Sequence, residues 1–327
     1  MDELEHAARQ AIAEGMVSGI SLGRVDRDDL RSCYLGRQGA IKPFNEREIR
    51  AGLYYDLASL TKVVGTTTRI MQLIDSGRID TETTVSTLLD RFRYQDITIG
   101  QLLLHNSGLP AEIRNKENLS RDTILNELYL TEPVQPPGRC FLYSDVGYIL
   151  LGLIIEVLDG KGLEESFRNH IFDPLGMDDT GYRLTRENDW FVPTECTAGR
   201  GCICGEVHDK KAYLLGPCGS AGLFSTLTDM MTFTAAVIRQ PAGLFGKTGI
   251  RLLEQTEVSG RTYGWSREYG PHTFYHTGFT GTSILIDQEG GAGLVILTNR
   301  IHPSRERTAF LEKRKELNEL FMKNLRS

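Results

Sequence analysis

The stretch DLASLTKVV, residues 56–64, places a serine and a lysine three positions apart, at Ser59 and Lys62. On a helix this spacing brings both side chains to one face. A serine hydroxyl is a weak nucleophile until a base takes its proton, and a lysine can act as that base once apolar surroundings lower its pKa. The leucine and valine neighbours in the stretch would provide such surroundings. A place near a helix N-terminus would also supply unpaired backbone N–H groups for an oxyanion.

Taken alone, this spacing is weak evidence, because two common residues three apart should occur about once by chance in a chain of this size. Two further motifs follow it in order, Tyr143-Ser144-Asp145 and His276-Thr277-Gly278. With the three motifs in this order, the chain resembles the serine β-lactamase and penicillin-binding-protein superfamily, especially the branch of class C β-lactamases, D-peptidases and carboxylesterases. Flanking segments extend the resemblance over roughly residues 20–300, namely 103–110, 137–138, 172–177, 206–209 and 220–226.

The resemblance implies an α+β fold of the β-lactamase/transpeptidase type: an antiparallel sheet flanked by helices, with an inserted, mostly helical subdomain. We expect the sheet domain to comprise residues 1–65 and 197–327, the subdomain to comprise 66–196, and the active site to lie in the groove between them.

The residue patterns agree with this fold. Residues 19–36 and 273–299 have the composition and turns of strands, and the last two strands of the second segment resemble an antiparallel hairpin. A C-terminal helix is expected from an N-cap at Ser304 onward. Helical patterns in the middle of the chain cover 67–76, 98–105, 121–130 and 146–158.

By the same resemblance, Ser59 is the acylated nucleophile and Lys62 its base, while Tyr143 passes a proton to the leaving group and later helps to activate water. The backbone N–H groups of Ser59 and Phe279 would hold the oxyanion. Tyr143 is a phenol with an ordinary pKa of about 10. It can transfer these protons only if that pKa falls, or if it relays protons while coupled to Lys62. The remaining substrate-binding residues would be Asp145, His276, Thr277 and Gly278.

Tyr143 and His105 could each have a structural role in place of a catalytic one. Tyr143 could be a core tyrosine with a satisfied hydroxyl, but the preceding Pro-Gly and the presence of Ser59 favour catalysis. His105 titrates near neutrality, yet its segment resembles a structural turn between helices, and we interpret it as a core histidine. The likeness around 206–209 also favours a structural role for His208 over metal ligation.

Two departures from the usual pattern of the superfamily bear on the substrate. Asp145 stands where asparagine is common, so a carboxylate that only accepts hydrogen bonds replaces an amide donor. His276 stands where lysine is common, and with an ordinary pKa of about 6.5 it is mostly neutral at pH 7. Both changes favour small neutral esters over β-lactams, unless partners of the two residues restore function, as they would if Asp145 pairs with Lys62.

Composition argues against several other functions. The 327 residues are 40% hydrophobic and carry a formal net charge of −6 spread along the chain, so we expect no nucleic-acid partner. The acidic N-terminus lacks the apolar stretch of a secretory signal, which indicates a cytoplasmic protein, or an extracytoplasmic one whose signal has been removed. The most apolar segment, 148–158, is too short to span a membrane. A phosphate loop and a His-Glu-x-x-His pair are missing, and no cofactor is expected.

The six cysteines raise the question of zinc. Cys196, Cys202 and Cys204 lie near His208 and Asp209 in the sequence, and Cys202 and Cys204 would share one face of a strand. The paired Cys-x-x-Cys spacing of a closed zinc site is missing, so thiols that fill space are favoured and no metal is expected.

The sequence therefore predicts a serine hydrolase that forms an acyl-enzyme on Ser59, most simply an esterase or amidase acting on small ester, amide or peptide substrates. A penicillin-binding protein, D-Ala-D-Ala carboxypeptidase or β-lactamase is an alternative with the same chemistry, and transfer of the acyl group to an alcohol or amine is another. A non-catalytic penicillin- or peptidoglycan-binding module is the alternative from a different class, but such a module needs no nucleophile with two proton carriers.

Overall fold

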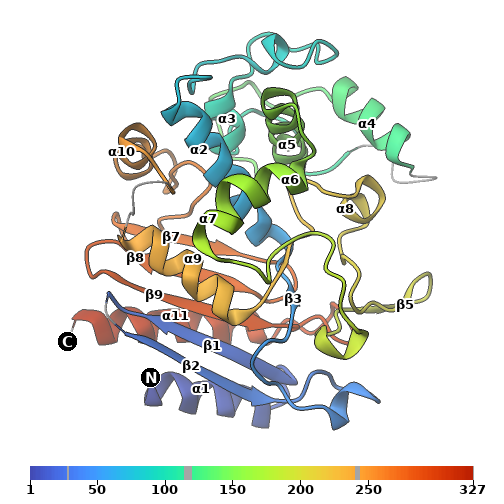
Figure 1. Cartoon of the computed structure of the whole chain (residues 1–327), viewed down its shortest axis with the longest axis vertical. Coiled ribbons are helices and arrows are strands. Elements are labelled where there is room, and N and C mark those ends of the chain that lie inside the picture. Colours follow the sequence, from blue (N-terminus) through green and yellow to red (C-terminus); the bar gives the residue numbers. More distant parts are fainter. Residues whose placement is uncertain (28, 114–119, 240–243, 327) are drawn as a thin grey trace.

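The computed structural model describes all residues except 28, 114–119, 240–243 and 327, and in this part of the chain five strands form an antiparallel sheet in the order β2-β1-β9-β8-β7 (Figure 1). The strands are β1 (Gly19–Val25), β2 (Leu30–Gly36), β7 (Thr273–Thr277), β8 (Ser283–Asp287) and β9 (Ala292–Thr298). Strand β9 is buried along its whole length. Its nearly unbroken apolar sequence is explained by helices that cover both faces of the sheet.

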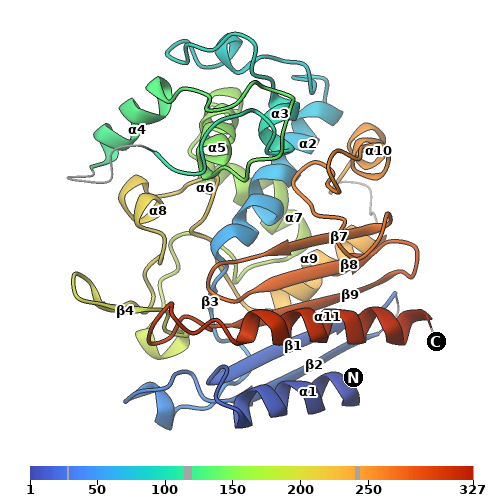
Figure 2. The same cartoon turned by 180° about the vertical axis from the view of Figure 1, so that it is seen from behind.

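Helices α1 and α11 lie side by side on one face of the sheet, and α9 lies on the other (Figures 1 and 2). Their bounds are Asp2–Ala13, Phe310–Arg326 and Leu227–Arg239. Successive residues of a strand point to opposite faces. In β9, Leu294 and Ile296 therefore belong to the core under α1 and α11, whereas Val295 and Leu297 belong to the larger core that includes α9.

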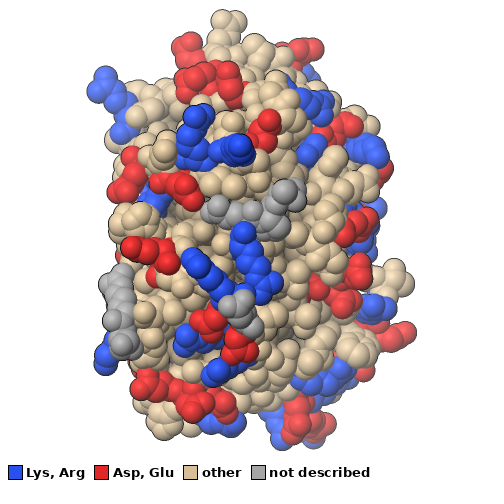
Figure 3. All heavy atoms as spheres, turned by 60° about the vertical axis from the view of Figure 1, so that its left-hand side comes forward, with Lys and Arg blue, Asp and Glu red and all other residues tan. Residues whose placement is uncertain are grey.

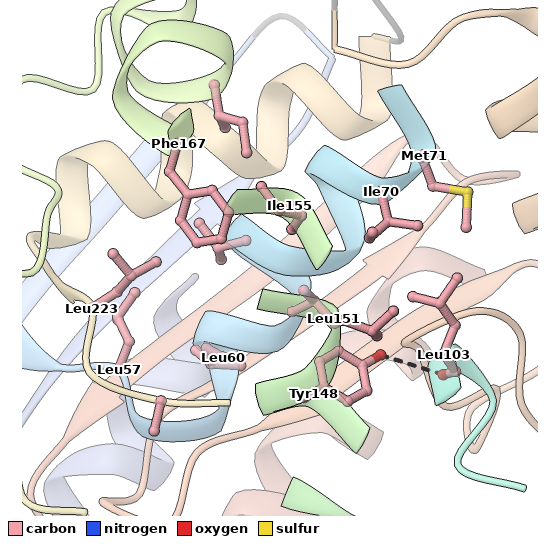
Figure 4. Packing of buried hydrophobic residues seen from close by; sticks show 14 of the residues in the cluster. Leu57, Leu60, Ile70, Met71, Leu103, Tyr148, Leu151, Ile155, Phe167 and Leu223 are labelled. Atoms are coloured by element: carbon pink, nitrogen blue, oxygen red, sulfur yellow. Dashed lines mark hydrogen bonds between the residues drawn. The ribbon is translucent and has the colours of Figure 1, made fainter. Parts of the chain in front are cut away.

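A layer of helices lies above the sheet in Figure 1. Its helices are α2 (Thr68–Asp75), α3 (Ile99–Leu103), α4 (Arg121–Leu130), α5 (Asp145–Asp159), α6 (Leu163–Phe167), α7 (Asp173–Leu175), α8 (Lys210–Leu215) and α10 (Lys247–Gln255). Helix α5 is buried over most of its surface, which explains why it is apolar nearly all round. Figure 4 shows Tyr148 and Leu151 of α5 packed near Leu60 and Leu103, with the Tyr148 hydroxyl donating a hydrogen bond to the Leu103 carbonyl at 3.3 Å.

Two short strand pairs connect these layers. Strand β3 (Tyr55–Asp56) pairs with β6 (Phe224–Ser225), and β4 (Cys196–Thr197) pairs with β5 (Gly201–Cys202). The β3–β6 pair lies directly before the Ser59 segment, so the segment leaves the sheet side of the molecule and enters the helical layer at this point (Figure 1).

The predicted α+β fold class, the strand segments and the C-terminal hairpin of β8 and β9 are confirmed. The four predicted helices in the middle of the chain correspond to α2, α3, α4 and α5. No helix among the described residues is both long and apolar enough to cross a bilayer. On the face shown in Figure 3, acidic and basic side chains are interspersed.

The predicted start of the C-terminal helix is wrong. Helix α11 begins at Phe310, and the Ser304 hydroxyl accepts instead from the backbone N–H of Glu306 at 3.2 Å, which is a local turn. The segment before the helix is held in a series of turns by arginine side chains, because Arg305 binds Glu195 and Arg307 donates to the carbonyl of His302. These tertiary contacts prevail over a local capping signal.

Candidate functional site

Ser59 lies at the centre of a short 3-10 turn, Ala58–Leu60, and not on a regular α-helix as predicted. Ala58 adopts the left-handed conformation, with φ of 46°, which costs a residue with a side chain roughly 1–2 kcal/mol. The backbone N–H of Ala58 donates to the Asp56 carboxylate at 2.8 Å and so stabilises the turn. The turn places Ser59 at the wall of a cavity of about 530 Å³.

Lys62 contacts Ser59, and its side chain is completely buried. Its Nζ is 2.9 Å from the Ser59 Oγ, 2.8 Å from the Ser220 carbonyl oxygen and 2.8 Å from Asp145 Oδ1. An ammonium group has three N–H donors, and here each one faces an acceptor. The predicted proximity of Ser59 and Lys62 is therefore present, although Lys62 begins a π-helical turn, Lys62–Thr67.

The expectation that burial would lower the pKa of Lys62 is wrong. Burial by itself does lower this pKa, but the negative charge of Asp145 and then the interaction with Tyr143 outweigh it, so the pKa lies above its ordinary value. Burial likewise raises the pKa of Asp145, while the charges of Lys62 and Lys211 outweigh this and lower it. The resting site thus contains a protonated lysine paired with an ionised aspartate.

The second motif, Tyr143-Ser144-Asp145, lies at the start of α5 and is held there by hydrogen bonds of Ser144. The Ser144 hydroxyl caps this helix by accepting from Gly147 N–H at 3.1 Å, and it donates to the Pro110 carbonyl at 2.7 Å. Tyr143, one residue earlier, projects its ring so that the Lys62 Nζ lies 5.0 Å from the ring centroid. The interaction with Tyr143 also helps to raise the pKa of Lys62.

His105 packs behind Tyr143, with the two rings stacked at 4.4 Å between centroids. Its Nδ1 accepts from the backbone N–H of Ser144 at 3.0 Å. Burial, followed by the charge of Arg261, lowers the pKa of His105 well below its ordinary value. A neutral, buried ring that orients the second motif agrees with the structural interpretation of His105.

The third motif is tied to the Ser59 turn by two threonines. The hydroxyls of Thr280 and Thr282 donate to the carbonyls of Asp56 and Leu57, at 2.8 and 3.1 Å. A Cβ on Gly278 would lie 2.5 Å from the Leu57 carbonyl oxygen, so only glycine fits this close approach. The loop after β7 is thereby held against the turn that contains Ser59.

Four of the five predicted oxyanion and substrate-binding residues line two adjoining cavities, and Gly278 is not among the lining residues of either. Asp145 and Phe279 line the cavity at Ser59. His276 and Thr277 line a second cavity of about 330 Å³, and Tyr143 borders both. Burial, then the charges of Arg261 and Lys62, lower the pKa of His276 well below its ordinary value, so this imidazole is neutral, as the sequence predicted.

A family model described as Beta-lactamase matches residues 5–317 of the chain. The chain belongs to the beta-lactamase family. The family and its relatives are hydrolases of the serine β-lactamase and penicillin-binding-protein type.

Two relatives and one solved structure illustrate the breadth of the beta-lactamase family. An N-acetylmuramyl-L-alanine amidase of Bacillus subtilis (strain 168) is 29% identical over 302 residues, which cover 76% of this chain and 68% of the relative. A putative D-alanyl-D-alanine carboxypeptidase of Salmonella paratyphi B is 29% identical over 306 residues, which cover 76% and 69%. EstCE1, a hydrolase with promiscuous acyltransferase activity, superposes with a TM-score of 0.77 at 19% identity, over 94% of this chain and 97% of that one, and supports the fold.

In this beta-lactamase family member, Lys211 is a site residue that sequence reasoning missed. It is buried at the start of α8, and its Nζ lies 3.4 Å from Asp145 Oδ2, 3.4 Å from Asp209 and 3.2 Å from Glu112. Asp145 therefore bridges two lysines, Lys62 and Lys211. No spacing in the sequence links these three residues, because they come from segments far apart in the chain that meet only in the folded structure.

His208, Phe279 and Arg305 line the same cavity, and the sequence analysis missed Arg305 and its partner Glu195. His208 stacks on Phe279 at 5.5 Å between ring centroids, and its Nε2 lies 2.9 Å from Glu195. Arg305 binds the same carboxylate at 2.6 Å and lies over the Phe279 ring. Hydrogen bonds from Arg305, together with one from His208, outweigh burial and lower the pKa of Glu195 to about 2. The contacts agree with a structural role for His208.

Proposed function

We propose that this chain is a serine hydrolase that cleaves an ester or amide through an acyl-enzyme on Ser59, with Lys62 and Tyr143 as the proton carriers. The observation that carries the proposal is the 2.9 Å contact between Lys62 Nζ and Ser59 Oγ at the wall of an open cavity. The interaction of Tyr143 with the same lysine adds a second group that can hold a proton.

In the proposed acylation step, the Ser59 oxygen attacks the carbonyl carbon and its proton passes to the Lys62–Tyr143 pair. The backbone N–H groups of Ser59 and Phe279 bind the oxyanion. The bond to the leaving group then breaks, and the pair returns the proton to the leaving oxygen or nitrogen. In deacylation, water takes the role of Ser59, gives its proton to the pair, and the Ser59 oxygen leaves with a proton from it.

Because the resting Lys62 is protonated, the pair must lose one proton before it can act as a base, and the two groups titrate together. Asp145 opposes this loss, since its negative charge stabilises the ammonium form of Lys62. Lys211 has the contrary influence, since its positive charge offsets that of Asp145. The proposed mechanism therefore predicts that these two residues set the pH dependence in opposite directions.

We expect Asp145→Asn to move the pH profile of acylation to lower pH and Lys211→Met to move it to higher pH. The measurement is the burst of p-nitrophenol from p-nitrophenyl butyrate between about pH 6 and 10. Lys210→Met is the matched control, because this neighbouring lysine lines the cavity but is not among the described residues that form an ion pair with Asp145. Shifts of both variants in the same direction would contradict the electrostatic argument.

For the substrate, small neutral esters are the first candidate, with His276 as the supporting residue, because a neutral ring stands where a lysine would attract a carboxylate. The negative charge of Asp145 does not support a preference for neutral esters, because the positive charges of Lys62 and Lys211 balance it. Its pairing with Lys62 matches the structural alternative for this residue.

A second candidate is an amide that carries a carboxylate, as in a cell-wall peptide. The cavity beyond His276 supports it, because Arg261, Arg314 and Lys315 contribute positive charge there against one acidic residue, Glu268. The amidase and carboxypeptidase named among the relatives support the same candidate. Arg314 comes from α11 and could replace the missing charge of the third motif.

The test compares kcat/KM for p-nitrophenyl butyrate, a D-Ala-D-Ala peptide, N-acetylmuramyl-L-alanine and a chromogenic cephalosporin. We expect the ester to be preferred, and Asp145→Asn combined with His276→Lys to move preference toward the cephalosporin. Arg314→Gln should lower only turnover of the anionic amides, by about tenfold for a lost charge-assisted contact, whereas Lys323→Gln on the same helix should change nothing. Cephalosporin turnover that rivals ester hydrolysis in the unmodified protein would refute the ester preference.

A further inference from the structure

Asp56 is a buried acidic residue of strand β3, three positions before Ser59, and only 2% of it is exposed. Each of its two carboxylate oxygens accepts a hydrogen bond from a backbone N–H. Oδ1 accepts from Ala58 at 2.8 Å, and Oδ2 accepts from His208 at 2.7 Å. The proposed catalytic cycle does not use this carboxylate, and Asp56 is not among the residues that line the cavity at Ser59. Its role must therefore lie in what it holds in place.

The bond to Ala58 fixes the peptide group that carries the N–H of Ser59. Ala58 has a φ of 46°, a conformation that residues with a side chain rarely adopt. A hydrogen bond to a carboxylate is among the stronger ones in proteins, so it can hold the residue in this conformation. Because the peptide between Ala58 and Ser59 is planar, the conformation of Ala58 sets the direction in which the Ser59 N–H points.

Asp56 also holds the surroundings of Phe279, whose N–H is the second oxyanion donor of the proposed mechanism. The Asp56 backbone carbonyl accepts from the hydroxyl of Thr280, the next residue along the chain from Phe279, at 2.8 Å. Its Oδ2 holds the backbone of His208, and the His208 ring stacks on the Phe279 ring at 5.5 Å between centroids. The loop of Phe279 is therefore attached to Asp56 both through its backbone neighbour and through its own ring.

We propose that Asp56 is the positioning residue of the oxyanion site, which sets the placement of the Ser59 and Phe279 N–H groups relative to each other. The inference rests on the proposed function, since it takes these two groups as the oxyanion donors. Such donors stabilise the oxyanion only when they already point to the place where it forms, and a misplacement of about 1 Å can slow catalysis about 10²-fold. Asp56 thus acts on the transition state through the backbone, without contact with the substrate.

Asp56→Asn is the test variant, because asparagine keeps the shape of the side chain but replaces one acceptor oxygen by an NH₂ donor. The N–H of either Ala58 or His208 then loses its acceptor. We expect single-turnover acylation by p-nitrophenyl butyrate to slow by about 10–100-fold. The half-saturating ester concentration should change less than about twofold, because the bound ester carries no oxyanion yet. The affinity for phenylboronic acid should fall by the same factor as the acylation rate, because its tetrahedral adduct with Ser59 places an oxygen at the oxyanion site.

Asp75→Asn is the matched control, because Asp75 likewise accepts two backbone N–H groups. Its oxygens accept from Gly246 and Gly249 at 2.6 and 2.8 Å, and these bonds join the end of α2 to the start of α10. Asp75 is not among the residues that line the cavity at Ser59. We expect Asp75→Asn to lower the melting temperature as Asp56→Asn does, but to keep the wild-type acylation rate and boronate affinity. A loss of activity that came from lower stability alone would appear in both variants.

Thr280→Val is the second variant, and it decides the question if circular dichroism shows that Asp56→Asn does not fold. It keeps the size of the side chain and removes the hydrogen bond to the Asp56 carbonyl. We expect it to lower the acylation rate and the boronate affinity by the same factor, about 3–10-fold. Wild-type acylation in the folded Asp56→Asn variant, or in Thr280→Val where that variant decides, would overturn the positioning role, and so would an equal loss in Asp75→Asn. A folded wild-type protein that boronate does not inhibit and that forms no acyl-enzyme would instead refute the proposed function, and this inference with it.

Discussion

Replacing Ser59 by alanine should abolish hydrolysis while leaving the melting temperature almost unchanged. The change removes one hydroxyl at the wall of an open cavity and creates no core void. Lys62 keeps its contacts with Ser220 and Asp145, so its charge stays compensated. The measurement is ester hydrolysis together with labelling by a fluorophosphonate probe, which should modify the wild-type protein at Ser59 and leave Ser59→Ala unmodified.

Ser86→Ala, at another half-buried serine, serves as the control and should keep full activity and full labelling. More than a small residual activity in Ser59→Ala would show that the proposed nucleophile is wrong. A wild-type protein that is folded but never labelled would instead favour a binding module without turnover.

Replacing Lys62 by methionine should slow acylation by about 10²–10⁴-fold, the usual worth of a positioned proton carrier. Methionine keeps much of the length and fits a buried site, but it cannot hold the proton of Ser59. Asp145 remains paired with Lys211 in this variant, so an isolated buried carboxylate does not arise and the fold should persist. The measurement is the single-turnover rate of acyl-enzyme formation.

Lys211→Met is the appropriate comparison for Lys62→Met, because it removes the other lysine from the same carboxylate. Its effect should be a shift of the pH profile with only a modest loss at the optimum. If Lys62→Met acylates at the wild-type rate, another residue is the base, and Tyr143 becomes the first candidate.

The sequence predicted the residues that the structure brings together at Ser59, since three ordered motifs are specific even when each one alone is not. It also predicted the strand segments of the main sheet and the helices α2, α3, α4 and α5, because alternation and helical periodicity report on burial. The roles of Ser59, Lys62 and Tyr143 stay predictions for experiment, as do the subdomain boundaries at 65 and 196.

Features that depend on packing could not be predicted in this way. The pKa of Lys62 rises because Asp145 and Tyr143 outweigh its burial, and the apolar neighbours in the sequence carry no information on that balance. Lys211 lines the cavity, and Glu195 holds two residues that line it, through contacts between distant segments. The start of α11 was misplaced for the same reason, since distant groups fix the chain at Arg305.

The sheet has a consequence for the order in which the protein can fold. Strand β1 is synthesised early, but it pairs with β9 towards the centre of the sheet. The β1–β9 ladder, in which Ile20 pairs with Thr298, can therefore form only after β9 has been synthesised. Such long-range pairing slows folding, because closing the long loop lowers the chain entropy before the stabilising contacts between the strands can form. The loop of Phe279 is held beside Ser59 by strands that also belong to this late ladder. A chain still emerging from the ribosome therefore has Ser59 but no completed sheet to support the loop of Phe279, and the proposed oxyanion site can form only after β9 has been synthesised.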